Sequence, residues 1–222
     1  MQRSRLPVKH QLQPRLNIKI STKGKLESKF IGSYPFNPDL IKSDYPFIVF
    51  AGRSNCGKSS LLNHLTGDIK LARVSSTPGR TRTINFFLIE NKIIFADLPG
   101  YGYSKASMSV KQSISKNVDG FLTSNSDSII IVSLLDIRVI PSKDDIELKE
   151  WADANYVPVI YVLTKSDKLP RSKRLTMQTE ICRALRLLKS PAIKPILYSS
   201  VTGEGRSELI KSIEDKIKSF PS

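Results

Sequence analysis

The sequence has few cysteines and no long hydrophobic run, and each absence excludes a class of protein. Two cysteines in 222 residues cannot form a disulfide framework, so the chain suits a reducing compartment. Its longest apolar runs, such as Ile129 to Leu135, are far shorter than the roughly 20 residues that a membrane-spanning helix needs. We therefore expect a protein with no membrane span.

Acidic residues are scarce beside basic ones. The chain has 35 Lys and Arg against 20 Asp and Glu, a formal net charge of +15. Its 40% hydrophobic and 25% charged content are those of a globular protein, and its length fits one domain with a tail. A positive surplus of this size attracts polyanions by electrostatic steering and counterion release, which favours a nucleic-acid partner. The alternative is a surface kept soluble by Lys and Arg.

The basic residues begin in an N-terminal segment. Residues 1–29 contain many Lys and Arg and a single acid, Glu27, and their two prolines interrupt any long helix. We expect a flexible basic arm, with an organelle transit peptide as the alternative, because no secretory hydrophobic core is present. Three prolines in residues 30–46 predict a lead-in with neither helix nor regular strand. The main domain would then span residues 47–222.

A glycine-rich stretch between an apolar strand and a helix start fits the pattern G-x-x-x-x-G-K-[ST]. It comprises Gly52, Arg53, Ser54, Asn55, Cys56, Gly57, Lys58 and Ser59, and Ser60 follows. The glycines let backbone N–H groups and a helix N-terminus face phosphate oxygens. Lys58 would lie against the β- and γ-phosphates, and the Ser59 hydroxyl would bind Mg²⁺. The alternative is a plain glycine turn between a strand and a helix.

Two more polar motifs follow predicted strands. Asp97-Leu98-Pro99-Gly100 comes after one of them, so that Asp97 could reach Mg²⁺ through a water and the Gly100 N–H could approach the γ-phosphate. Thr164-Lys165-Ser166-Asp167 follows another. Its Asp167 could accept two hydrogen bonds from guanine while the Lys165 stem covers the base. Such a site would prefer GTP over ATP, because adenine lacks that donor pair. Each motif could instead be an ordinary turn.

The order of the predicted elements defines the fold class. Apolar runs alternate with amphipathic segments, including expected helices over 108–122 and 172–188, and the last strand, 193–198, ends in Tyr198-Ser199-Ser200, which could offer a backbone N–H to guanine O6. We predict a three-layer α/β fold with helices on both faces of a mostly parallel six-stranded sheet and one antiparallel edge strand. Ligands in such sheets lie beyond the carboxyl ends of the strands, where each polar motif falls.

Together these motifs resemble a Ras-like GTPase, and more specifically the EngB (YihA) family of ribosome-biogenesis GTP-binding proteins. The matching segments are Phe50 to Asn63, Thr77 to Thr81, Ile84 to Phe87, Asp97 to Tyr103, Asp136 to Arg138 and Thr164 to Lys168. The Gly-Tyr-Gly-Tyr and Asp-Ile-Arg motifs distinguish this family from related GTPases. Cys56 and Ser166 depart from the residues more usual in the family, and neither is a side chain with an assigned role.

The resemblance implies further site residues and partners. Thr81 would complete Mg²⁺ coordination and act in catalysis with Lys58 and Gly100. The loop that closes over the nucleotide would consist of Gly79, Arg80, Thr81, Arg82 and Thr83. The resemblance also implies a bacterial-type cytoplasmic protein that binds GTP or GDP and assists assembly of the large ribosomal subunit on a pre-ribosomal particle, with a link to cell division. Asn55 lies where relatives bind K⁺. We expect a monomer.

One position departs from Ras-type enzymes. Tyr101 follows Gly100, where those enzymes place a glutamine that orients water, and intrinsic turnover even with glutamine is roughly 10⁻⁴ s⁻¹. We therefore expect slow hydrolysis that K⁺ or a ribosomal partner accelerates. Two other functions stay open at this point. The chain could be an RNA-binding module with GTP as a structural ligand, or a P-loop ATPase or kinase.

Overall fold

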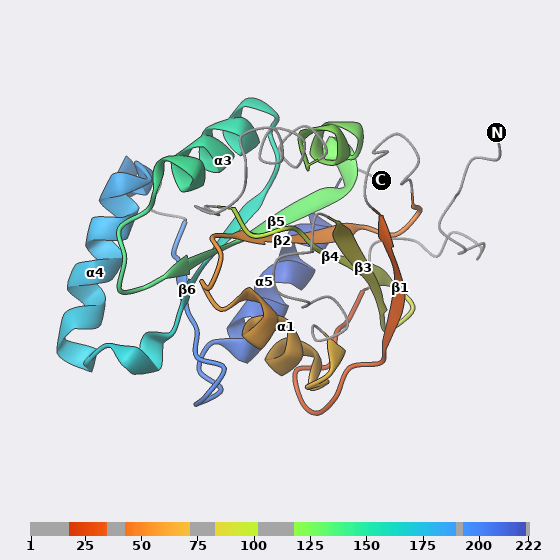
Figure 1. Cartoon of the computed structure of the whole chain (residues 1–222), viewed down its shortest axis with the longest axis horizontal. Coiled ribbons are helices and arrows are strands. Elements are labelled where there is room, and N and C mark those ends of the chain that lie inside the picture. The colour runs from red at the N-terminus through yellow and green to blue at the C-terminus, as the bar shows by residue number, and fades with distance from the viewer. Residues whose placement is uncertain (1–17, 35–42, 72–82, 102–117, 190–192, 221–222) are drawn as a thin grey trace.

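The computed structural model describes residues 18–34, 43–71, 83–101, 118–189 and 193–220, and in this part of the chain helices cover both faces of a seven-stranded sheet (Figure 1). The strands are β1 (Ser28–Tyr34), β2 (Phe47–Gly52), β3 (Ile84–Ile89), β4 (Ile93–Asp97), β5 (Ile129–Asp136), β6 (Val159–Thr164) and β7 (Ile196–Leu197). The α-helices are α1 (Lys58–Thr66), α3 (Lys143–Ala154), α4 (Arg171–Ala184) and α5 (Arg206–Lys218). Residues 118–124 are also helical, and short 3₁₀ turns cover Ser126–Ser128, Ser166–Lys168 and Leu187–Lys189.

The sheet order β1-β3-β4-β2-β5-β6-β7 places β2 at the centre. Strand β2 pairs in parallel with β4 and β5, and parallel pairing continues through β6 to β7. All residues of β2 are buried, as expected for a parallel strand with helices on both sides. The carboxyl ends of β2, β4, β5, β6 and β7 therefore meet at one edge of the sheet, as predicted.

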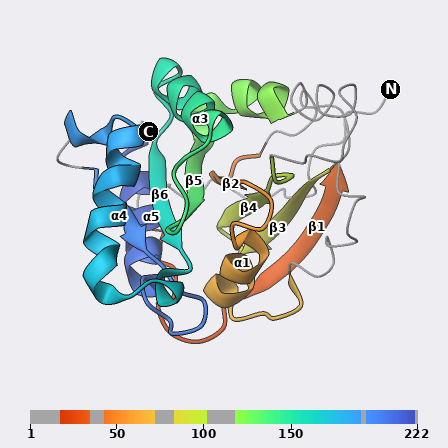
Figure 2. The same cartoon turned by 60° about the vertical axis from the view of Figure 1, so that its left-hand side comes forward.

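Alternate side chains of each strand enter different cores. On one face Ile48 and Phe50 pack with buried side chains of α1 and α5. On the other face Phe47 and Val49 pack with the helical residues 118–124 and with α3. A third cluster joins β5 and β6 to α4. Figure 1 shows α1 and α5 below the sheet and α3 above it, and Figure 2 gives a second view of the same elements.

The sequence prediction missed one strand. Residues Ser28–Tyr34 form β1 and pair antiparallel with β3, so the expectation that residues 30–46 hold no regular strand is wrong for residues 30–34. The sheet of the described residues has seven strands rather than six, and its antiparallel edge consists of β1 paired with β3, which is also antiparallel to β4. The register of β1 shifts between Phe30 and Gly32, a bulge that weakens the alternating pattern by which strands are recognised.

Part of the predicted flexible arm also packs onto the domain. Ile18, Ile20 and Leu26 are buried in the same core as α1 and α5, and the Leu26 N–H donates to Thr66 O at 2.7 Å. The arm boundary at residue 29 therefore has to be corrected, since residues 18–34 belong to the folded unit. The sequence hid this because its basic composition dominates the segment, whereas three separated apolar side chains provide the packing.

One guanidinium group fastens this segment. Arg206, at the start of α5, donates to Gly24 O at 2.9 Å, to Leu65 O at 2.8 Å and to His64 O at 3.3 Å, and also to Thr22 O. His64 O and Leu65 O are carbonyls in the last turn of α1, which lack partners within a helix. A single charged side chain thus joins the N-terminal segment, α1 and α5.

The remaining elements follow the sequence predictions with small differences. The side chain of Asp145 accepts a hydrogen bond from the Ser142 N–H at 2.7 Å, which forms part of a capping box at the start of α3, and α5 buries one apolar face. The last strand is much shorter than residues 193–198, and of the expected helix over 108–122 only the part from residue 118 is described. No helix in the described ranges is long and apolar enough to span a membrane.

Candidate functional site

The glycine-rich loop connects the central strand β2 to α1, and its backbone is tightly constrained. A Cβ atom on Gly52 would lie 2.7 Å from both Cys56 Sγ and Leu134 O, so only glycine fits there. Gly57 has φ 103° and Asn55 has φ 65°, both in the left-handed region. The first turn of α1 carries no acidic side chain and no side-chain cap, which leaves its N–H groups available to an anion.

Lys58, at the end of this loop, meets the carboxylate of Asp97. Asp97 ends β4, paired in register with Phe50 of β2, and its carboxylate forms an ion pair with Lys58 Nζ. Both side chains are largely buried. The second carboxylate oxygen of Asp97 accepts a long hydrogen bond of 3.5 Å from Asn85 Nδ2. Asn85 Oδ1 in turn accepts one from Ser33 Oγ at 2.5 Å, so β1 contributes to the surroundings of the predicted metal ligand.

The polar atoms around this pair suit a magnesium nucleotide. Ser59 starts α1 beside Lys58, and Asp97 supplies a carboxylate, so both offer the hard oxygen ligands that Mg²⁺ prefers. Ser54 Oγ is one of two buried side-chain oxygens in the described residues without a hydrogen-bond partner, although buried hydroxyl groups are normally satisfied. An orphaned hydroxyl inside the predicted phosphate loop fits a site built for a ligand.

The segment after β4 lies directly against the loop. Leu98 N–H donates to Phe50 O at 3.1 Å, and beyond Pro99 the Tyr101 N–H donates to Gly52 O at 3.3 Å. In return Tyr101 O accepts from Ser54 N–H at 2.9 Å. A Cβ on Gly100 would lie 3.1 Å from Ser54 Oγ, so this approach also favours glycine. Gly100 therefore sits beside the phosphate loop, as its predicted role requires.

The predicted base-binding residues gather at the ends of β6 and β7. Ser199 Oγ donates to Asp167 Oδ1 at 2.7 Å, and this hydrogen bond holds the pKa of Asp167 below its usual value. Thr164 Oγ1 donates to Cys56 O at 2.5 Å, and Lys165 Nζ donates to Asn55 O at 2.5 Å. Two of the predicted base-binding residues thus bond directly to the predicted phosphate loop.

Three predicted contacts have other partners in this structure. The side chain of Tyr198 is buried in the core, with its hydroxyl 2.7 Å from His64 Nδ1. The backbone N–H groups of Tyr198 and Ser199 donate to Leu163 O and Glu204 O, so neither of these two is available to guanine O6 in this structure. The Ser166 hydroxyl also donates to Glu204, at 2.6 Å. Of Tyr198, Ser199 and Ser200, which follow β7, the N–H of Ser200 is the one that no hydrogen bond within the described residues uses.

Several predicted residues cannot be placed. Gly79, Arg80, Thr81 and Arg82 lie outside the described residues, and Thr83 is half-buried just before β3. Cys56 is buried, and this burial raises the pKa of its thiol, which disfavours the reactive thiolate form.

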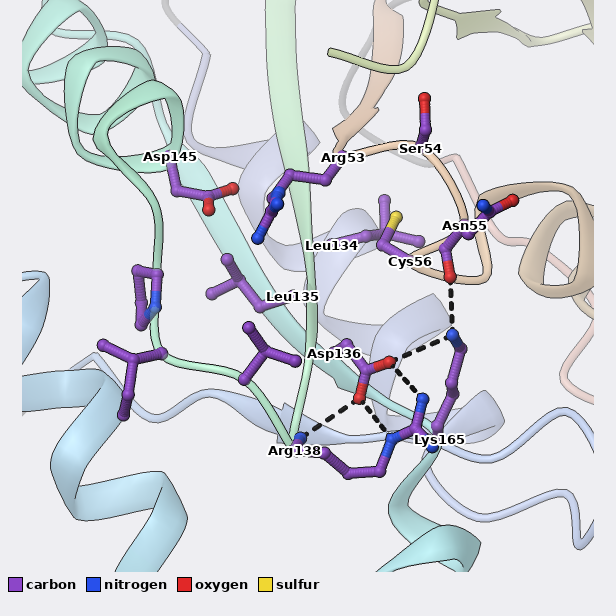
Figure 3. Close-up of a pocket in the computed structure, with 13 residues that line it drawn as sticks. Arg53, Ser54, Asn55, Cys56, Leu134, Leu135, Asp136, Arg138, Asp145 and Lys165 are labelled. Carbon is purple, nitrogen blue, oxygen red and sulfur yellow. Dashed lines mark hydrogen bonds and ion pairs between the residues drawn. The ribbon is translucent and has the colours of Figure 1, made fainter. Parts of the chain in front are cut away.

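A cavity of about 280 Å³ lies beside the loop, at the end of β5 (Figure 3). Arg53 is exposed and extends across this end on the side of Asp145, while Asp136, Arg138 and Lys165 form a charged cluster on the other side. In the sequence, Asp136 and Arg138 served only as part of a family motif, and no contact was predicted for either side chain. Their position directly after a buried parallel strand was the available signal.

Comparison with known proteins first gives the class. The family model for a 50S ribosome-binding GTPase matches residues 47–165, which run from the start of β2 to the Thr-Lys motif after β6. With the phosphate loop and the Thr-Lys-x-Asp motif at one edge of a parallel sheet, the fold is that of a P-loop GTPase.

The relatives then give the family. The chain is 43% identical over 184 residues to the EngB GTP-binding protein of Desulfatibacillum aliphaticivorans, covering 83% of this chain and 85% of that protein. It is 37% identical over 190 residues to EngB of Halothermothrix orenii, covering 86% and 94%. The chain therefore belongs to the EngB family of GTPases, which bind GTP and GDP with Mg²⁺.

Solved structures agree with this assignment. The crystal structure of an EngB GTP-binding protein superposes with a TM-score of 0.65 at 25% identity, covering 78% of this chain and 98% of that one. Era in complex with MgGDPNP and nucleotides 1506-1542 of 16S ribosomal RNA superposes with a TM-score of 0.58 at 27% identity, covering 80% and 57%. The predicted Ras-like fold is confirmed.

Proposed function

We propose that this chain is a slow, magnesium-dependent GTPase that acts as a switch in assembly of the large ribosomal subunit. The observation that carries the proposal is the convergence of two sites on one loop. Lys58 of the phosphate loop pairs with Asp97, and Thr164 and Lys165 of the base motif bond to the loop at Cys56 and Asn55. A nucleotide bound along this edge would contact both sites at once.

Each group has a role in this proposal. The loop N–H groups and Lys58 bind the phosphates, Ser59, Asp97 and Thr81 hold the Mg²⁺ that neutralises phosphate charge, and Gly100 approaches the γ-phosphate. Asp167, oriented by Ser199, accepts the paired donors of guanine. The remaining proposed contacts with the nucleotide come from the backbone around these side chains.

The slow rate follows from Tyr101. Its hydroxyl donates to Asp145 on α3, so its donor hydrogen is already used, and the ring has no amide that could orient water. We propose that K⁺ bound near Asn55, or a ribosomal partner, supplies the missing stabilisation. Multiple-turnover phosphate release measured in KCl and in NaCl tests this, and equal rates in the two salts would exclude the K⁺ role.

The ribosomal role rests on charge and on relatives. A formal net charge of +15 suits an RNA partner, and the matched family model is described as ribosome-binding. We infer a cytoplasmic monomer that binds a pre-ribosomal particle in the GTP state, with residues 1–17 as a basic arm. Co-sedimentation with large-subunit precursors should require GTP rather than GDP, and should weaken when residues 1–17 are removed.

The nucleotide assignment has a direct test. Fluorescent GDP should be displaced by GTP and not by ATP, and Asp167→Asn should move the preference toward xanthine nucleotides because an amide can donate where the carboxylate accepted. The matched control is Asp215→Asn, an exposed aspartate of α5 paired with Lys218. Equal competition by ATP in the wild-type protein would contradict the proposed base site.

A further inference from the structure

The ammonium group of Lys165 is held between two oxygens from separate loops. Its Nζ donates to Asn55 O in the phosphate loop at 2.5 Å and lies 3.0 Å from Asp136 Oδ2 at the end of β5 (Figure 3). Its side chain is about a quarter exposed, and that of Asp136 is less so. Lys165 therefore joins the carboxyl ends of β5 and β6 to the loop that follows β2.

Asp136 is itself held by Arg138, which bonds to both of its carboxylate oxygens, including the one that Lys165 contacts. The backbone N–H and Nε of Arg138 donate to Asp136 Oδ1 at 3.1 and 2.9 Å, and Nη2 of Arg138 donates to Oδ2 at 2.7 Å. Burial acts to raise the pKa of Asp136, but the hydrogen bonds from Arg138 and Lys165 outweigh it and lower the pKa to about 2. The carboxylate is thus ionised and rigid at neutral pH.

The two residues that meet through Lys165 Nζ both have unusual backbones. Asn55 has φ 65° and Lys165 has φ 59°, and residues other than glycine are seldom found in the left-handed region. Such conformations persist where surrounding contacts hold them. The contact of Lys165 Nζ with Asn55 O is one such restraint, and the charge of Asp136 keeps the ammonium at that place.

We propose that Asp136 is a positioning residue for the nucleotide site, acting through Lys165 to hold the phosphate loop and the base motif in one arrangement. This inference rests on the proposed function, since it concerns the same site. Asp136 itself need not contact the nucleotide. Arg138 acts one step further out, as the group that orients Asp136.

The roles of Asp136 and Asp167 differ. Asp167 is oriented by Ser199 and distinguishes one base from another, whereas Asp136 determines how firmly Lys165 covers any base and braces Asn55. Loss of the Asp136 charge should therefore speed the dissociation of GDP and GTP by similar factors, and leave the preference for guanine over xanthine unchanged.

The test is a double-mutant cycle on the dissociation rate of fluorescent GDP. Asp136→Asn keeps the shape of the side chain and removes its charge, and Lys165→Met keeps the apolar stem and removes the ammonium. We expect Asp136→Asn to speed dissociation about tenfold in the wild-type background, the size expected for one lost hydrogen bond between charged groups, and to have little effect in the Lys165→Met background.

The control is Asp153→Asn, an exposed aspartate whose partner is Lys149 on α3, and it should dissociate GDP at the wild-type rate. Urea unfolding without nucleotide checks that each variant is folded. An equal effect of Asp136→Asn in both backgrounds, or no effect in either, would overturn the inference. Failure of the wild-type protein to bind GDP would instead overturn the proposed function.

Discussion

The hydroxyl group of Tyr101 donates a hydrogen bond of 2.7 Å to Oδ1 of Asp145. The other carboxylate oxygen of Asp145 accepts the N–H and the hydroxyl of Ser142, each at 2.7 Å, at the start of α3. Because the backbone of Tyr101 also pairs with the phosphate loop at Gly52 and Ser54, this residue joins the loop to α3. The position after Gly100 is thus a structural brace in this protein.

Replacing Tyr101 with phenylalanine should destabilise the protein. The variant removes one donor and leaves Asp145, which is 3% exposed, with a buried oxygen that has lost a partner. We expect the free energy of unfolding to fall by about 1–3 kcal/mol. Urea denaturation measures it, with Tyr156→Phe as the control because Tyr156 is 95% exposed. Equal stability of the two variants would contradict the brace.

The same tyrosine should make the fold sensitive to alkaline pH. Burial, and next the charge of Asp145, raise the pKa of Tyr101 above its ordinary value of 10.0. A raised pKa in the folded state means that its stabilising contribution is complete below pH 10 and is lost as the pH rises from there toward the folded-state pKa. The free energy of unfolding should therefore decline above about pH 10, and less steeply in Tyr101→Phe than in Tyr156→Phe.

Leu26 should be essential to stability although it lies in the basic N-terminal segment. Its side chain is fully buried in the core that also contains side chains of α1 and α5. Leu26→Ala should cost about 2–5 kcal/mol of unfolding free energy, from lost burial and the cavity left behind. Leu175→Ala is the control, since Leu175 is 72% exposed on α4. A Leu26→Ala effect as small as that of the control would mean that residues 18–34 do not belong to the folded unit.

Removal of magnesium should act through Asp97. In the proposed site Asp97 and Ser59 hold Mg²⁺ beside the phosphates, so EDTA should speed GDP dissociation from the wild-type protein. Asp97→Asn should dissociate GDP quickly in Mg²⁺ already and respond weakly to EDTA. The exposed Asp215→Asn should respond as the wild type does. A full EDTA response in Asp97→Asn would remove Asp97 from the metal site.

Much of the secondary structure and of the site is determined by residues close together in sequence, and could therefore be predicted from the sequence. A pattern such as Gly52 to Ser59 carries its own backbone constraints, and a run such as Ile129 to Leu135 carries the burial of a parallel strand. The capping box of Ser142 and the apolar face of α5 are likewise short-range. The P-loop GTPase class can be predicted from such motifs and from their order along the chain.

Only the tertiary structure shows the features that depend on contacts between residues distant in sequence. Strand β1 exists because β3 offers it backbone partners, while its own composition and bulge give little strand signal. Tyr101 contacts Asp145, and Lys165 contacts Asp136. Neither pair could be predicted from a sequence motif or from hydrophobic periodicity. Local propensity predicts an element, whereas hydrogen bonds between distant segments form only after the sheet has brought the ends of its strands together.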